Sequence, residues 1–233
     1  MRPQKYNLDW FHDLGNLLFP KVCDGCGTPL NSQEDLLCLT CLYQLPRTNF
    51  HLYKANPIAQ KFWGRTPINE AFSFLLFEKG NMTQRLLHAL KYRHRQDIGE
   101  RLGLIFGRDL AEDSYSGPDY IIPLPLHETK HKIRGYNQCT SIVNGMTIHL
   151  GIPVLHDAVK RITANATQTN KGRFERWLNV ENIFAVVSPE ILSGKHILLV
   201  DDVITTGSTL EACAKVLLAS GVREVSLATL ASA

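Results

Sequence analysis

The feature that most constrains the fold of this 233-residue chain is a succession of strand, turn, helix and strand near its carboxyl end. The apolar run 196–200 leads into Asp201 and Asp202, and a turn of Thr, Gly and Ser residues follows. The next apolar residues keep helical spacing, Gly221 predicts the end of that helix, and residues 222–230 predict a second strand. A buried strand that passes through a helix to another buried strand indicates a parallel crossover.

The same alternation of apolar runs and amphipathic stretches begins near residue 70. It predicts strands at 71–77, 120–122 and 183–187 and helices from Asn81 and at 136–150. We therefore expect an α/β fold, a parallel sheet flanked by helices. No apolar run reaches the ~18–20 residues of a transmembrane helix, and the first twenty residues lack a signal-peptide core, so we expect a cytoplasmic protein.

Four of the six cysteines form the pattern Cys23-x2-Cys26-x11-Cys38-x2-Cys41. Two CxxC pairs joined by a short loop allow four thiolates to converge on Zn²⁺, and Gly27 suits the tight turn that such a knuckle needs. Two disulfides or a redox CxxC are the alternatives; a cytosolic location disfavours the first, and the presence of two pairs disfavours the second. The pattern predicts a structural zinc site, because four thiolates leave no open position for catalysis.

Turn and breaker residues with little periodicity fill residues 46–67, as in an irregular connector. We therefore place a domain boundary near residue 65. Residues 1–65 are expected to hold an N-terminal helix, the zinc ribbon and this connector, and residues 66–233 the α/β domain.

The turn after the strand at 196–200 predicts a phosphate site. Its residues are Thr205, Thr206, Gly207, Ser208 and Thr209. At a helix N-terminus they present backbone N–H groups, hydroxyls and a positive dipole end, while paired acids at a strand end accept hydrogen bonds from vicinal hydroxyls. A diol beside a phosphate indicates a ribose 5-phosphate. The alternative is a capping box of Ser208 and Glu211 next to solvated acids; Glu211 would also repel a phosphate unless its side chain points away.

Through this motif the sequence resembles the type I phosphoribosyltransferases, and more closely the ComF family, in which a four-cysteine zinc ribbon precedes a phosphoribosyltransferase-like domain. The shared segments are the cysteines, residues 197–209, 90–92, 123–125 and 134–138, and a block with Arg161, Gln168, Arg176, Asn179 and Phe184.

The resemblance implies that Asp201 and Asp202 hold the ribose hydroxyls of phosphoribosyl pyrophosphate as catalytic residues, and that residues 205–209 hold its 5-phosphate. It also implies magnesium between pyrophosphate and ribose, and a pyrophosphate loop at 123–125. The basic residues that follow this loop, Lys130, Lys132 and Arg134, are expected to bind pyrophosphate; an exposed basic loop is the alternative.

The distribution of charge along the chain does not identify the ligand. Residues 79–176 hold 15 Lys and Arg against 9 Asp and Glu, an excess of +6 in a chain of net charge +3, which suits a phosphorylated ligand, a nucleic-acid backbone or simply a solvated face.

Two functional hypotheses follow. In the first, the protein is a phosphoribosyltransferase that uses an unknown acceptor and is linked by the resemblance to competence and DNA uptake. In the second, it is a non-catalytic competence factor that binds a phosphoribosyl ligand, single-stranded DNA and DNA-uptake proteins. A zinc-ribbon nucleic-acid binder with a degenerate catalytic fold is a third reading.

Overall fold

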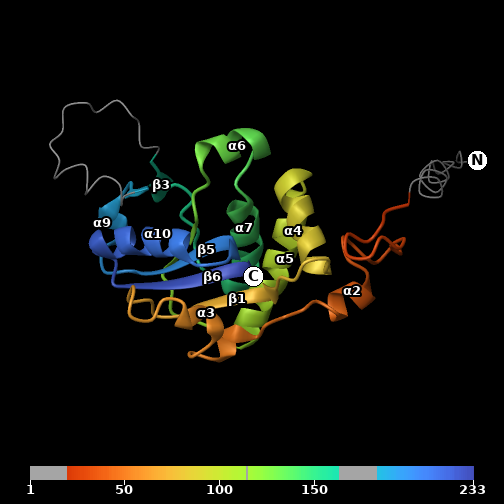
Figure 1. Cartoon of the computed structure of the whole chain (residues 1–233), viewed down its shortest axis with the longest axis horizontal. Helices are drawn as coiled ribbons and strands as arrows, with labels where there is room; N and C mark the ends of the chain where they lie inside the picture. The colour runs from red at the N-terminus through yellow and green to blue at the C-terminus, as the bar shows by residue number, and fades with distance from the viewer. Residues whose placement is uncertain (1–19, 114, 163–182) are drawn as a thin grey trace, which may run out of the picture. The chain divides into compact units, whose positions relative to one another are not determined.

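The computed structural model describes residues 20–113, 115–162 and 183–233 (Figure 1). Its contacts divide the chain into two compact units, residues 1–45 and 46–233. The predicted N-terminal helix lies outside the described residues. None of the helices in the described ranges is long and apolar enough to cross a membrane.

The second unit is built on a sheet of four parallel strands in the order β1-β6-β5-β2. The strands are β1 (Ala71–Leu76), β2 (Tyr120–Pro123), β5 (His196–Ile204) and β6 (Glu224–Ser232). A separate antiparallel pair consists of β3 (Val159–Arg161) and β4 (Phe184–Val186). The predicted parallel sheet is confirmed, and every strand expected from the sequence is present.

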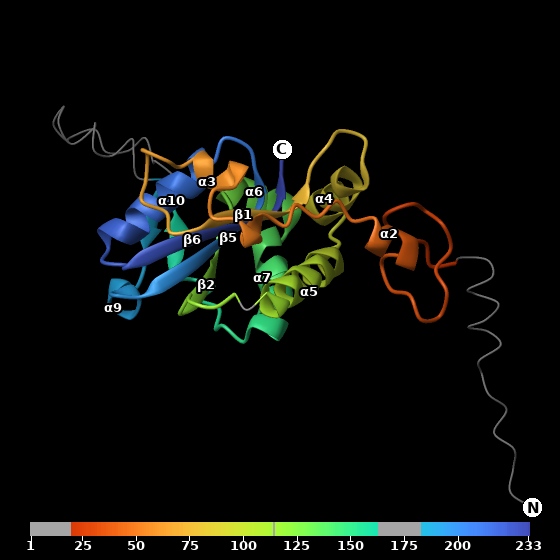
Figure 2. The same cartoon turned by 90° about the horizontal axis from the view of Figure 1, so that it is seen from below.

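Helices cover both faces of the sheet, α10 on one and α5 and α7 on the other (Figure 2). The longer helices are α4 (Met82–Tyr92), α5 (Gln96–Glu112), α7 (Gln138–Leu150) and α10 (Ser208–Ala219). The shorter ones are α2 (Leu39–Tyr43), η1 (Phe50–Leu52), α3 (Pro57–Gln60), α6 (Glu128–Arg134) and α9 (Pro189–Leu192). As predicted, Asn81 caps α4, because its side chain accepts a hydrogen bond from the backbone N–H of Gln84.

Strand β5 is the central element of the fold. Its apolar half, residues 197–200, is fully buried, as the sequence predicts. The strand does not end at Val200: it continues to Ile204, because Asp201, Val203 and Ile204 keep their pairing with β6. The two acids therefore lie within the carboxyl-terminal part of a strand that is fixed on both sides.

The connector at 46–65 packs into the second unit, whereas the sequence places it with the zinc ribbon. The amide of Asn56 donates to the carbonyl of Ala71 in β1 (2.8 Å), and its oxygen caps α3. The ring of Phe62 is only 1% exposed and lies against Gly207. These contacts explain why the division between the units falls after Leu45.

Candidate functional site

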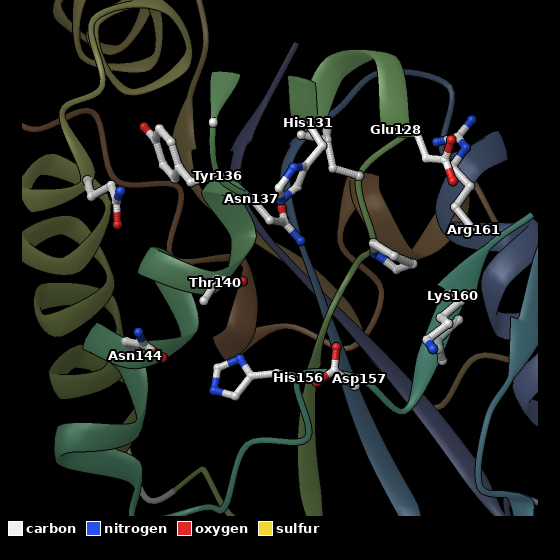
Figure 3. A pocket seen from close by; sticks show the side chains of 15 residues that line it. Glu128, His131, Tyr136, Asn137, Thr140, Asn144, His156, Asp157, Lys160 and Arg161 are labelled. Atoms are coloured by element: carbon white, nitrogen blue, oxygen red, sulfur yellow. The ribbon is translucent and has the colours of Figure 1, made fainter. Parts of the chain in front are cut away.

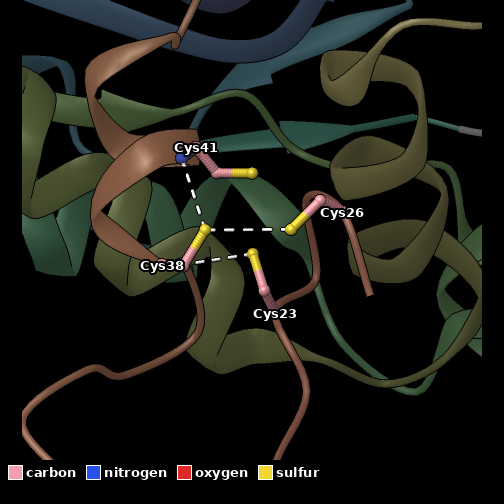
Figure 4. A group of neighbouring side chains, drawn as sticks. All are labelled: Cys23, Cys26, Cys38 and Cys41. Atoms are coloured by element: carbon pink, nitrogen blue, oxygen red, sulfur yellow. Dashed lines mark hydrogen bonds between the residues drawn. The ribbon is translucent and has the colours of Figure 1, made fainter. Parts of the chain in front are cut away.

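In the first unit, the four predicted metal ligands Cys23, Cys26, Cys38 and Cys41 converge (Figure 4). Their four sulfur atoms lie within 4.8 Å of one another. The Sγ atoms of Cys26 and Cys38 are 3.7 Å apart. Tetrahedral zinc with bonds of about 2.3 Å places its sulfurs about 3.8 Å apart, so the donor set and spacing fit four-thiolate zinc.

Backbone geometry supports this cluster. Gly27 has a φ of +79°, which glycine adopts without strain, as the predicted knuckle requires. The N–H groups of Gly25 and Cys38 donate to the sulfur of Cys23 (3.3 and 3.2 Å). Such hydrogen bonds orient the sulfur and stabilise negative charge on it.

In the second unit, the predicted phosphate turn joins β5 to α10 and surrounds a small hollow of about 40 Å³, lined by Asp201 and residues 203–210. Gly207 has a φ of +80° and precedes the first residue of α10. The hydroxyls of Thr206 and Ser208 lie 3.0 Å apart at the exposed rim. Asp201 and the turn thus share one concave surface, next to the N-terminus of α10.

Glu211 in the first turn of α10 points away from this hollow. Its carboxylate pairs with Arg65, accepts a hydrogen bond from the hydroxyl of Thr66 (3.2 Å) and lies 3.0 Å from Nζ of Lys215. Two cations neutralise this acid on the far side of the helix, so the repulsion considered from the sequence does not arise at the turn.

Asp201 is held by two donors. The backbone N–H of Asp202 donates to its Oδ1 (2.7 Å), and the thiol of Cys139 in α7 donates to the same oxygen (3.5 Å). Burial of the carboxyl group, and then the negative charge of Asp202, raise the pKa of Asp201 to about 7. Asp201 therefore exists in both protonation states near neutral pH.

Asp202 has two cationic partners instead. Nζ of Lys91 in α4 lies 3.0 Å from its Oδ1, and Nη1 of Arg134 in α6 lies 3.9 Å from its Oδ2. Arg134 is 9% exposed; it also donates to Oε1 of Gln138 (2.7 Å) and lies over the ring of Tyr92, 5.5 Å from its centroid.

The three predicted pyrophosphate residues therefore differ. Arg134 is buried against Asp202, whereas Lys130 and Lys132 are exposed on α6. Lys91 pairs with Asp202 across elements that are far apart in the chain, which no local pattern reveals.

The segment 134–138 links several elements around the acid pair. The hydroxyl of Tyr136 donates to the carbonyl of Leu90 in α4, and the amide of Asn137 donates to the carbonyl of Leu124 (2.9 Å) in the predicted pyrophosphate loop. Gly135, with a φ of +74°, ends α6. This segment fixes the backbone of α4, α6 and α7 beside the carboxyl end of β5.

A larger pocket of about 670 Å³ lies beside the segment 134–138 (Figure 3). Helix α7 contributes Thr140 and Asn144 to its wall, β3 contributes Lys160 and Arg161, and the loop before β3 contributes His156 and Asp157. Several residues of the shared segments line this pocket, namely Pro125, Gly135, Tyr136, Asn137 and Arg161, whereas the acid pair and the turn at 205–209 do not. Of the residues in the shared block, Gln168, Arg176 and Asn179 lie outside the described residues.

The sequence has known relatives. A family model described as the phosphoribosyl transferase domain matches residues 138–233. Competence protein F of Haemophilus influenzae is 39% identical over 117 residues, 50% of this chain and 51% of that protein. DNA utilization protein YhgH of Escherichia coli (strain K12) is 34% identical over 144 residues, 60% of this chain and 63% of that protein. The matched region thus spans less than two thirds of these relatives.

Solved structures are similar to this chain at lower identity. Glutamine phosphoribosylpyrophosphate amidotransferase from B. subtilis, complexed with ADP and GMP, is 20% identical, with a TM-score of 0.43, over 61% of this chain and 30% of that chain. A purine phosphoribosyltransferase from Pyrococcus horikoshii is 20% identical, with a TM-score of 0.36, over 57% and 72%.

Proposed function

We propose that this chain, whose four-cysteine cluster, phosphoribosyl transferase domain and competence-named relatives fit the ComF family, binds phosphoribosyl pyrophosphate with magnesium and transfers the 5-phosphoribosyl group to an acceptor. The observation that carries this proposal is the shared hollow formed by Asp201 and the turn at residues 205–209. A phosphate at the turn and a ribose at the acid pair are the two ends of one ligand.

The turn has the chemistry to hold the 5-phosphate. Backbone N–H groups at the start of α10, together with the hydroxyls of Thr206 and Ser208, offer hydrogen bonds to phosphate oxygens, and the helix dipole adds positive potential. Gly207 suits this turn, because it has a φ of +80° and a Cβ there would lie 2.8 Å from Cζ of the buried Phe62 ring.

The acid pair has the chemistry to hold the ribose. The carboxylates of Asp201 and Asp202 would accept hydrogen bonds from its two hydroxyls. As the bond between C1 and pyrophosphate breaks, its electron pair leaves with pyrophosphate, positive charge develops on the ribose, and a lone pair of the acceptor bonds to C1. Carboxylates beside the ribose stabilise that charge.

The leaving group needs cations. Oxygen donors such as these carboxylates suit magnesium, which when bound supplies positive charge to the departing pyrophosphate. Lys130, Lys132 and Arg134 of α6 are the proposed protein contacts of pyrophosphate. In the first unit, we propose that the four cysteines hold a structural zinc.

Calorimetric titration of the full chain with phosphoribosyl pyrophosphate and magnesium tests the binding step. We expect saturable heat from the wild type. Thr206→Val keeps the shape of the turn but removes a hydroxyl, and should weaken binding about tenfold or more, because a hydrogen bond to a charged group contributes about 1.5–3 kcal/mol. The exposed Thr40→Val in the first unit is the control. Absence of heat from a folded wild type contradicts the proposal.

The second candidate is a non-catalytic, DNA-binding competence factor. The names competence protein F and DNA utilization protein YhgH favour a link to competence and DNA use. Pyrophosphate release separates the two. If the protein binds the ligand but liberates no pyrophosphate with any candidate base or amine, and binds single-stranded DNA with steep salt dependence that survives Asp201→Asn, the second candidate holds.

A further inference from the structure

Lys91 lies beside the acid pair and can contact either Asp202 or a bound ligand. We propose that Lys91 pairs with Asp202 when the site is empty and moves to an anionic oxygen of the ligand's pyrophosphate when the site is filled, which frees Asp202 to accept the ribose hydroxyls. This inference rests on the proposed function, whose ligand it takes as given.

In the structure, both oxygens of Asp202 face cations. Lys91 lies at Oδ1 (3.0 Å) and Arg134 at Oδ2 (3.9 Å), and the Asp202 side chain is only 15% exposed. Both oxygens of this mostly buried carboxylate are turned toward cations, so a ribose hydroxyl at Oδ1 competes with the ammonium group of Lys91. Movement of one cation would open Asp202 to the sugar.

Arg134 is the cation held in place. Besides Asp202, its guanidinium has the Gln138 oxygen at 2.7 Å and the ring of Tyr92 beneath it. A planar guanidinium with three such neighbours loses several contacts if it moves.

Lys91 is the cation that can move. Among the described residues, Asp202 is the only side chain with which it forms an ion pair. The backbone next to Lys91 is fixed, because the hydroxyl of Tyr136 donates to the carbonyl of Leu90. The ammonium group itself is carried on a flexible chain of four methylene groups. The ammonium group can therefore change partner while helix α4 stays in position.

An anion must receive this ammonium group. The Lys91 side chain is 19% exposed, and a mostly buried ammonium group without a counter-ion is costly. Pyrophosphate supplies that counter-ion, whereas ribose 5-phosphate, which carries its phosphate at the other end, does not. The exchange therefore predicts that Lys91 discriminates between the two ligands.

The test is calorimetric titration of Lys91→Met with each ligand in the presence of magnesium. Methionine keeps the length and apolar stem of lysine without its charge. We expect the Kd for phosphoribosyl pyrophosphate to rise about tenfold or more, and the Kd for ribose 5-phosphate to stay the same or fall, because Asp202 is released. Lys195→Met is the matched control: it breaks a lysine pair with Asp119 (3.5 Å) at the opposite end of β5 and should change neither Kd.

Each other outcome overturns the inference or the function beneath it. Equal weakening of both ligands, or an unchanged Kd for phosphoribosyl pyrophosphate, assigns Lys91 a structural role only. A folded wild type that binds neither ligand overturns the proposed function instead. Should Lys91→Met unfold, Lys91→Gln is titrated in the same way, and the ratio of its two Kd values decides.

Discussion

Asp201 and Asp202 are neighbours in the chain, yet their carboxyl groups have different surroundings. Asp201 is held by a thiol and a backbone N–H, and Asp202 by two cations. The sequence predicts that both acids lie beside the turn, because strand, acids and turn are consecutive. It does not predict their partners, since Cys139, Lys91 and Arg134 come from three other helices. Cys139 is 4% exposed, and its thiol donates to Asp201.

The raised pKa of Asp201 predicts a pH-dependent cost to stability. The pKa of Asp201 is about 7 in the folded protein, against 3.8 for an unperturbed aspartate. Between these pH values the folded state binds more protons than the unfolded state, so the protein loses stability as pH rises through them. Asp201→Asn should therefore match the wild type near pH 4 and exceed it at pH 8, by on the order of 1 kcal/mol or more. Urea unfolding at pH 4 and pH 8 measures the difference in free energy of unfolding between the two proteins. The same difference at both pH values would contradict the raised pKa.

The same shift predicts how ligand affinity depends on pH. An ionised Asp201 accepts a hydrogen bond from a ribose hydroxyl more readily than a protonated one does. Ionisation of Asp201 should therefore increase the affinity for ribose 5-phosphate as pH rises from about 6 to 8. The charge of Asp202 raises the pKa of this carboxyl group further, whereas the thiol of Cys139 and the charge of Lys91 lower it. Because phosphate ionises in the same range, the relevant quantity is the difference between wild type and Asp201→Asn. Identical pH profiles for the two proteins would contradict the assignment.

At the scale of elements, periodicity predicts β1, α4, β2 and the crossover from β5 to β6 close to their observed bounds. It misplaces the end of β5, because pairing with β6 carries the strand through polar residues that a hydropathy pattern excludes. It also misses α6 as a helix of its own. Gly135 at positive φ separates α6 from α7, and the sequence alone does not distinguish that break from a loop.

Helices α5 and α7 pack closely enough that glycine is required at their contact. A Cβ at Gly145 would lie 2.1 Å from the carbonyl oxygen of Glu100 and 2.6 Å from the backbone N of Leu104. These are backbone atoms of the partner helix, so the helices must separate. Gly145→Ala should lower the free energy of unfolding by about 1–3 kcal/mol despite the better helix propensity of alanine.

Asn144→Ala at the neighbouring exposed position of α7 is the control for this substitution and should stay within about 0.5 kcal/mol of the wild type. Chemical denaturation measures both variants. A Gly145→Ala protein as stable as the wild type would show that the two helices tolerate a wider separation.

At the scale of the whole molecule, the chain consists of a small cysteine-rich unit and a larger α/β unit. The sequence predicts this division from the clustering of cysteines, but not the contacts of the connector, because Asn56 and Phe62 show their role only once β1 and Gly207 lie beside them. The large pocket bounded by α7 and β3 could not be predicted, since its lining comes from segments without a shared pattern.

Metal removal should affect the two units differently. The purified protein should contain about one zinc per chain, and a chelator should increase hydrogen exchange in residues 20–45 while residues 46–233 keep their protection. Within residues 20–45, few groups other than the cysteines are buried, whereas the larger unit has its own core. Zinc-free protein with unchanged exchange in residues 20–45 would contradict a structural zinc.

The most direct test of the central claim is a crystal structure of the full chain with phosphoribosyl pyrophosphate and magnesium. We expect the 5-phosphate within hydrogen-bond distance of the turn at residues 205–209, and the ribose hydroxyls against Asp201 and Asp202. Ligand density confined to the pocket between α7 and β3, with the turn vacant at saturating ligand, would contradict it.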